Sequence, residues 1–142
     1  MAYDDSNVFA KILRGEMPSF KVYEDDKTLA FMDVMPQAEG HTLVIPKFPA
    51  ENLFDLAPDY AVAMALTVKK LAPAVRKAFD APGLMIVQLN GSAAGQTVFH
   101  IHTHLIPRAH GLELKFHARE MADFGELKNH AARIIEALGE SA

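Results

Sequence analysis

The amino-acid sequence predicts an α+β fold, with an antiparallel sheet of about five strands and flanking helices. Two observations carry this prediction. Five short stretches rich in β-prone residues are bounded by turn-forming residues, as is typical of strands. Apolar residues also recur at spacings of three and four in the middle of the chain and near its end, as in helices that bury one face. The predicted strands cover residues 20–23, 28–32, 41–46, 83–89 and 96–108.

Length and composition limit the functions that the chain can have. At 142 residues it is expected to form one domain with a core of its own. The net charge of −4 argues against a surface for polymeric nucleic acid but leaves room for a pocket that binds one nucleotide. Cysteine is absent, which excludes disulfides and thiol chemistry. The acidic start does not resemble a signal peptide and no apolar run is long enough to cross a membrane, so we expect a cytoplasmic protein.

A short helix is expected first. Ser6 can cap its N-terminus, and the apolar residues that follow would continue the helix to Arg14. The next two strands flank a polar turn at residues 24–27, so we expect them to form a hairpin. Asp33 follows the second of these strands, where an acidic residue is more often a turn former than a ligand. Without further information, these elements predict packing rather than chemistry.

Two longer helices are expected, one after the third strand and one after the fifth. The apolar stripe of the first consists of Met64, Val68, Leu71, Val75 and Phe79. Pro73 should kink or split this helix, because proline lacks the backbone N–H and crowds the preceding turn. The apolar seam of the second consists of Phe124, Leu127, Ala131, Ile134 and Leu138. This seam must cover the sheet or meet a partner, whereas His117 and His130 are expected to be solvated.

The stretch from Gln96 to Arg108 is the most informative part of the sequence. Read as a strand, it places every second side chain on the same face. One face then carries Val98, His100, His102, His104 and Ile106. The other carries Phe99, Ile101, Thr103 and Leu105, which need a core to cover them. Three imidazoles in a row are a poor choice for stability alone, so the stretch indicates chemistry.

Three interpretations of this row compete. The histidines can alternate without a function, or they can bind zinc, since neutral imidazole is a common zinc ligand. Against zinc, no carboxylate or cysteine lies between Asp80 and Glu113 to complete the shell. The third interpretation is nucleophilic catalysis at phosphorus. It is favoured by Gln96 and Thr97, whose amide and hydroxyl are neutral donors suited to phosphate oxygens.

The same stretch resembles the signature of the histidine triad (HIT) family, in which three histidines alternate with hydrophobic residues. The matching segment is His100-Ile101-His102-Thr103-His104-Leu105-Ile106, with Thr103 as a departure at a hydrophobic position. Further blocks similar to the family lie at residues 7–18, 30–38, 40–47 and 94–99. The resemblance covers about residues 7–108 of a single HIT-like domain over 1–142. Residues 109–142 then form a C-terminal helical extension.

This resemblance implies an activity and an assembly. It points to the nucleoside phosphoramidase-like branch of the family, whose members hydrolyse derivatives of purine nucleoside monophosphates such as AMP and GMP. No metal or other cofactor is expected. The resemblance also implies a homodimer that forms by joining the sheets of two copies. A dinucleoside polyphosphate hydrolase is the nearest alternative enzyme. A nucleotide-binding interaction or sensor module with negligible turnover is the alternative from another class.

The resemblance also implies roles for individual residues. The catalytic residues would be His102, His104, His100 and His41, of which His102 would attack the α-phosphorus and form a nucleotidyl intermediate. The phosphate-binding residues would be Gln96, Thr97 and Asn90. The ribose- and base-binding residues would be Asp33, Val34, Val8, Phe9, Phe31 and Leu43. Leu89 stands where the family commonly has an asparagine or glutamine, so either Asn90 replaces that amide or one neutral donor is missing.

Overall fold

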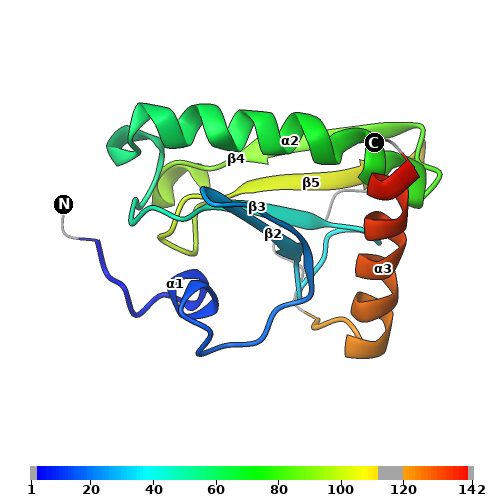
Figure 1. Ribbon diagram of the computed structural model, residues 1–142, viewed down its shortest axis with the longest axis horizontal. Helices are drawn as coiled ribbons and strands as arrows, with labels where there is room; N and C mark the ends of the chain where they lie inside the picture. The colour runs from blue at the N-terminus through cyan, green and yellow to red at the C-terminus, as the bar shows by residue number, and fades with distance from the viewer. Residues whose placement is uncertain (1–2, 112–119, 141–142) are drawn as a thin grey trace.

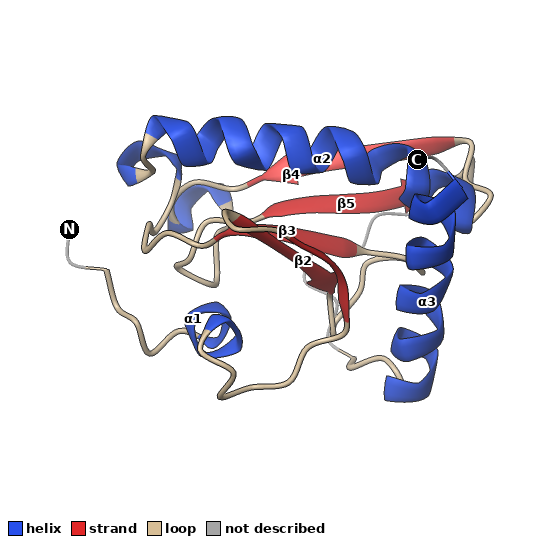
Figure 2. Cartoon of the chain, in the orientation of Figure 1, coloured by secondary structure: helices blue, strands red, loops and turns tan. Residues whose placement is uncertain are grey.

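The computed structural model describes residues 3–111 and 120–140 and has the predicted α+β fold (Figures 1 and 2). One antiparallel sheet holds five strands in the order β1-β2-β3-β5-β4. The strands are β1 (Lys21–Glu24), β2 (Thr28–Met32), β3 (Thr42–Pro46), β4 (Gly83–Gln88) and β5 (Thr103–Arg108). The helices are α1 (Val8–Leu13), α2 (Pro58–Ala78) and α3 (Phe124–Glu140), with short 3₁₀ turns at Leu53–Asp55 and Ser92–Ala94. No helix within the described ranges combines the length and the apolar character that crossing a bilayer needs.

The sheet separates two cores of different size. α2 crosses one face, and α3 packs against α2 and β1 (Figure 1). The core on this face is formed by Val22, Ala30, Met32, Val44, Met64, Leu71, Ala74, Val75, Leu105, Leu127, Ala131, Ile134 and Ala137. The smaller core on the other face, beside α1, is formed by Phe9, Leu29, Phe31, Leu43 and Ile45. Because successive residues of a strand face opposite sides, β2 and β3 are buried along their whole length.

The apolar seam of α3 packs within its own chain. Leu127, Ala131 and Ile134 belong to the core that α2 shares, so the seam covers this side of the fold. His130 is not solvated, contrary to the prediction, because the helix turns its ring into this contact. The ring lies edge-on to Phe79, with centroids 5.1 Å apart. His117 lies outside the described residues.

Two helix predictions can be compared with the structure. The N-cap of α1 is Asn7 rather than Ser6, because the Asn7 side chain accepts the backbone N–H of Ala10 at 2.9 Å. Ser6 instead donates to the carboxylate of Asp4. Pro73 does not split α2, which is continuous from residue 58 to 78. Pro73 lies on the exposed side of the helix, so water can satisfy the carbonyl that loses its partner.

The strand predicted at 96–108 is shorter in the structure. β5 begins at Thr103, and His104 is the triad histidine that lies within it. Upstream, the backbone leaves the ladder because the N–H of Ile101 donates to the carbonyl of Ala50 at 3.0 Å, in the loop after β3. The predicted core face is correspondingly incomplete, since Phe99 is 37% exposed.

Candidate active site

A cavity of ≈ 610 Å³ opens on the α1 face of the sheet. Such a volume is within the range that small ligands commonly fill. The lining residues are Val8, Phe9, Asp33, Val34, Met35, Gln37, His41, Leu43, Met85, Val87, Leu89, Gly95, Thr97, Val98, His102, His104 and Ile106. They come from α1, from the loop after β2, from β3, β4 and β5, and from the loop before β5. Three of the four predicted catalytic histidines therefore share this space.

The hydrogen-bond partner of His102 fixes which of its two ring nitrogens carries the hydrogen. Its Nδ1 lies 2.8 Å from the backbone carbonyl oxygen of His100. Because a carbonyl oxygen only accepts, Nδ1 carries the hydrogen and the neutral ring keeps its lone pair on Nε2. Burial lowers the pKa of His102, which favours the neutral ring at pH 7. The ring of Phe9 packs edge-on against it, with centroids 4.9 Å apart.

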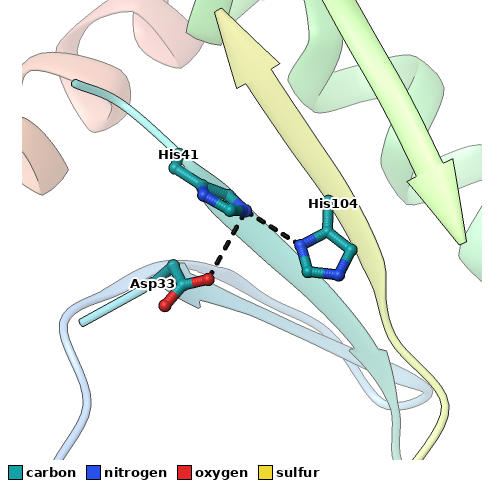
Figure 3. Close-up of side chains that lie close together, drawn as sticks. All are labelled: Asp33, His41 and His104. Atoms are coloured by element: carbon teal, nitrogen blue, oxygen red, sulfur yellow. Dashed lines mark hydrogen bonds and ion pairs between the residues drawn. The ribbon is translucent and has the colours of Figure 1, made fainter. Parts of the chain in front are cut away.

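His41 contacts both His104 and Asp33 through its Nε2 atom (Figure 3). Nδ1 of His41 accepts the backbone N–H of Gln37 at 2.9 Å, so the hydrogen of the neutral ring is on Nε2. That Nε2 lies 2.9 Å from Nδ1 of His104 and 3.4 Å from a carboxylate oxygen of Asp33. Nδ1 of His104 therefore accepts, and neutral His104 carries its own hydrogen on Nε2.

Burial sets the charges of these groups. It lowers the pKa of His41 to about 3, to which the neighbouring His104 and His102 also contribute. Burial lowers the pKa of His104 to about 4 and raises that of Asp33 to about 6. At pH 7 the contact between His41 and Asp33 is consequently one between a neutral ring and a carboxylate, rather than a pair of opposite charges.

His100 lies behind the cavity rather than in its wall. Its ring is 1% exposed, and Nε2 donates to the carbonyl oxygen of Pro46 at 2.9 Å. Nδ1 lies 2.6 Å from the hydroxyl of Tyr3, a residue that sequence reasoning did not select. Burial lowers the pKa of His100 to about 4. His100 thus contacts His102 through its backbone carbonyl.

Comparison with protein families places this geometry in a known context. The HIT domain model matches residues 14–111, which span all five strands and the four histidines. The chain belongs to the HIT family. It is similar along its length to Protein hit of Bacillus subtilis, with 40% identity over 139 residues, 94% of this chain and 95% of that protein.

Two further relatives extend the comparison. Adenosine 5'-monophosphoramidase HNT1 of Candida albicans is 37% identical over 147 residues, which cover 99% of this chain and 96% of that protein. The crystal structure of a Hit-like protein from Bartonella henselae is similar with a TM-score of 0.90 and 47% identity, over 96% of this chain and 99% of that one. The likeness therefore extends over the whole HIT fold, beyond the triad stretch.

Gln96 supports a loop in this HIT domain. Its amide nitrogen donates to the carbonyl oxygens of Glu51 at 2.6 Å and Val98 at 2.9 Å. Its side-chain oxygen accepts the N–H of Gly91 at 2.8 Å, and the residue is 3% exposed. The structure thus places Gln96 behind the cavity, where it shapes the loop, rather than at the phosphate position that the sequence predicted. Its polar atoms are all engaged, which explains the difference.

Asn90 is also turned away from the cavity lining. Its oxygen accepts the N–H of Leu53 at 2.8 Å, and its amide nitrogen donates to Gln88 at 3.2 Å. Asn90 is therefore not placed to replace the amide that Leu89 lacks, and the apolar Leu89 itself lines the cavity. Of the three residues predicted to bind phosphate, Thr97 is the one that lines it.

The residues predicted to contact ribose and base lie together, with one exception. Asp33, Val34, Val8, Phe9 and Leu43 line the cavity. Phe31 lies one layer deeper, where its ring packs edge-on against Phe9 at 5.5 Å. Sequence reasoning missed Met85 and Val87 of β4, although the alternation of that strand places them on one face. It also missed Gln37, for which no local pattern gives a signal.

Asp33, His41 and His104 are the described residues whose positions fit a metal ion. One ligand atom from each lies within 4.8 Å of the others. The group contains one triad histidine, so it differs from the zinc site that the alternating row suggested. His100 is outside this group because both of its ring nitrogens are engaged, with Tyr3 and with the Pro46 carbonyl, and His102 is not among the three residues either. An ion among the three would displace the hydrogen that joins His41 to His104.

Proposed function

We propose that the protein is a metal-independent nucleotide hydrolase of the HIT type. It would cleave the bond between the α-phosphorus of a purine nucleoside monophosphate and a nitrogen or other leaving group. The observation that carries this proposal is the state of His102, whose Nδ1 is held by a carbonyl and whose Nε2 remains available to a ligand in the cavity. The relative named adenosine 5'-monophosphoramidase supports a phosphoramidate as the substrate.

The reaction would proceed in two displacements at phosphorus. In the first, a bond forms between Nε2 of His102 and the α-phosphorus, the bond from phosphorus to nitrogen breaks, and the departing amine takes a proton from solvent. In the second, water attacks phosphorus, the bond to Nε2 breaks, and a proton is released. The N–H of His104 Nε2 and the hydroxyl of Thr97 are the groups proposed to stabilise negative charge on the phosphoryl oxygens.

The rest of the cavity would hold the nucleoside. The Asp33 carboxylate can accept hydrogen bonds from both hydroxyls of a ribose, and one of its oxygens is already fixed by the N–H of Met35 at 2.8 Å. The base would lie between apolar walls contributed by Val8, Phe9, Val34 and Leu43. Phe31 would act from behind by supporting the ring of Phe9.

We further propose that a single domain over residues 1–142 forms a homodimer through β4. The edge strands of the sheet are β1 and β4, and α3 packs against β1. β4 is therefore the edge that a second copy can extend. Apolar side chains are exposed on β4 and on α2, which contacts it, with Ile86 of β4 at 52% and Leu66 of α2 at 66%. Light scattering should report a dimer for the native chain and for Ile135→Glu, and a monomer for Leu66→Glu; a monomeric native chain would refute this assembly.

The test of the activity is AMP release from an adenosine phosphoramidate in the presence of a chelator. The native chain should release AMP, and His102→Ala should bind AMP in a calorimeter yet release none. His110→Ala is the matched control, because His110 is exposed outside the cavity lining. Loss of native activity on chelation would exclude the metal-independent mechanism.

One observation favours a second function, a nucleotide sensor with negligible turnover. Leu89 lines the cavity with an apolar side chain at the position where the family resemblance implies a neutral donor, and loss of one such donor costs on the order of a hundredfold in rate. Under this alternative, the native chain binds AMP and releases none from the phosphoramidate. Leu89→Asn should then restore turnover.

A further inference from the structure

The segment that precedes α1 reaches the histidine behind the nucleophile. The hydroxyl oxygen of Tyr3 lies 2.6 Å from Nδ1 of His100. The two rings meet edge-on, with centroids 5.7 Å apart. These residues are 97 positions apart in the sequence, and no sequence motif relates them. The contact therefore arises from the fold.

The direction of each hydrogen bond follows from the partners. The carbonyl oxygen of Pro46 only accepts, so Nε2 of His100 carries a hydrogen. Burial favours the neutral ring, which leaves a lone pair on Nδ1. Tyr3 consequently donates to His100. The Tyr3 oxygen accepts from the side-chain amide of Asn7 at 2.9 Å, so the hydroxyl is satisfied both as donor and as acceptor.

Asn7 connects this contact to the cavity wall. Its side-chain oxygen caps α1 by accepting the N–H of Ala10 at 2.9 Å. The helix that it caps carries Phe9, whose ring packs against His102. One side chain thus fixes both the Tyr3 hydroxyl and the start of the helix beside the nucleophile.

We propose that Tyr3 is a positioning residue of the active site. By donating to Nδ1 of His100, it fixes the residue whose backbone carbonyl holds the ring of His102 in its nucleophilic tautomer. Tyr3 donates to the His100 ring, that ring donates to the Pro46 carbonyl of β3, and His102 donates to the His100 carbonyl. Tyr3 is absent from the residues that line the cavity, so it acts through His100. This inference rests on the proposed function, because it concerns the same nucleophile.

Loss of the hydroxyl would leave the buried Nδ1 of His100 without a donor. A buried acceptor in that state is costly, and the ring can rotate or change tautomer to regain a partner. Either change disturbs the backbone carbonyl that orients His102. Small displacements of a reacting group lower rates by about ten- to a hundredfold. Nucleotide affinity should change little, because the residues that line the cavity remain in place.

The experiment compares Tyr3→Phe with Tyr23→Phe in the full chain. Both replacements remove one hydroxyl and keep the ring. The Tyr23 hydroxyl donates to Asp25 at 2.9 Å and lies outside the cavity lining, which makes it a matched control. Two measurements are made: kcat and KM for AMP release from an adenosine phosphoramidate, and long-range ¹H–¹⁵N spectra of the histidine rings without nucleotide.

For Tyr3→Phe we expect kcat to fall about tenfold while KM stays within about twofold, and the ring nitrogens of His100 and His102 to shift. Tyr23→Phe should match the native chain in all of these. Native kcat together with native ring spectra in Tyr3→Phe would overturn the inference. Failure of the native chain to release AMP would refute the proposed function instead. The ring spectra would still decide whether Tyr3 holds the two histidines.

Discussion

The two faces of the sheet carry different kinds of residue. The face under α2 and α3 is filled by apolar side chains, and Leu71, Leu105 and Ile134 are 0% exposed there. The other face carries the cavity, and the helix α1 beside it has only six residues. Both faces use the same strands, since Leu105 of β5 belongs to the large core while its neighbour His104 lines the cavity. The α2 face thus holds the larger apolar core, whereas the α1 face combines a smaller core with the cavity of the proposed chemistry.

His102→Ala should have the largest effect on activity and a small effect on stability. The loss of the proposed nucleophile should lower kcat at least about a thousandfold. The free energy of unfolding should change by only about 1 kcal/mol, because the ring, although buried, borders the cavity on one side. Single-turnover AMP release and urea unfolding measure the two effects. A loss of about 2–5 kcal/mol of unfolding free energy, as for truncation of a core residue, would mean that the division between the faces is wrong.

Ile134→Ala should have the reverse effect. Ile134 is 0% exposed in the large core, and its removal should cost about 2–5 kcal/mol of unfolding free energy. Ile135→Ala is the control, since this neighbour of the same type on the same helix is 50% exposed and should cost less than about 0.5 kcal/mol. Urea unfolding gives both values. The kcat of the folded fraction should remain native in both variants. A large fall in kcat in either variant would mean that packing on the α2 face also controls the site.

Gly40 marks the place where the two faces are coupled. A Cβ atom there would lie 2.5 Å from the Phe79 ring, φ is +87°, and His41 follows directly. Gly40→Ala should destabilise by about 1–3 kcal/mol and also lower kcat, because relief of the clash moves His41. Gly15→Ala is the control for backbone strain alone, with φ +78° and no atom within 4 Å. If the two variants have the same free energy of unfolding and the same kcat, the two faces are not coupled at Gly40.

Acidification should reveal the cost of burying histidines on the cavity face. In the folded state the pKa is about 3 for His41 and about 4 for His100 and His104, below the ordinary value of 6.5. Between pH 6.5 and 4 the unfolded chain therefore binds more protons, and stability falls as the pH falls. Asp33, with its pKa raised to about 6, opposes this trend between pH 6 and 4.

These three histidines, together with His102, whose pKa is also lowered by burial, outweigh one carboxyl and predict a net loss on the order of 1–3 kcal/mol per pH unit near pH 5. Urea unfolding at pH 7, 6 and 5 measures it. His41→Gln should flatten the decline, because one of these histidines is removed. Stability that is constant or rises from pH 7 to pH 5 would show that these rings are not neutral in the folded protein.

Local sequence patterns sufficed for the elements but not for the contacts between them. Stretches of β-prone residues bounded by turn-forming residues located β2, β3 and β4, and helical spacing located the buried seam of α3. The alternation read between Gln96 and Arg108 wrongly continued β5 back to Gln96. The upstream backbone instead bonds to Ala50, a partner that no local period encodes.

The site shows the same limit. The triad contains two of the histidines that line the cavity, His102 and His104, yet it gave no sign that Gln96 and Asn90 bind the backbone or neighbouring loops. The contact of Tyr3 with His100 was equally invisible, because it joins segments far apart in the chain. Local periodicity predicts which way a side chain points, whereas its hydrogen-bond partner depends on the tertiary fold.

The most direct test of the account is capture of the covalent intermediate. The native chain is mixed with excess adenosine phosphoramidate, quenched within one turnover, digested, and mapped by mass spectrometry under conditions that preserve bonds between phosphorus and nitrogen. We predict one adenylyl group, located on His102 and absent from His102→Ala. Rapid AMP release with no adenylyl group on His102, or with the group on another residue, would contradict the assignment of Nε2 of His102 as the nucleophile.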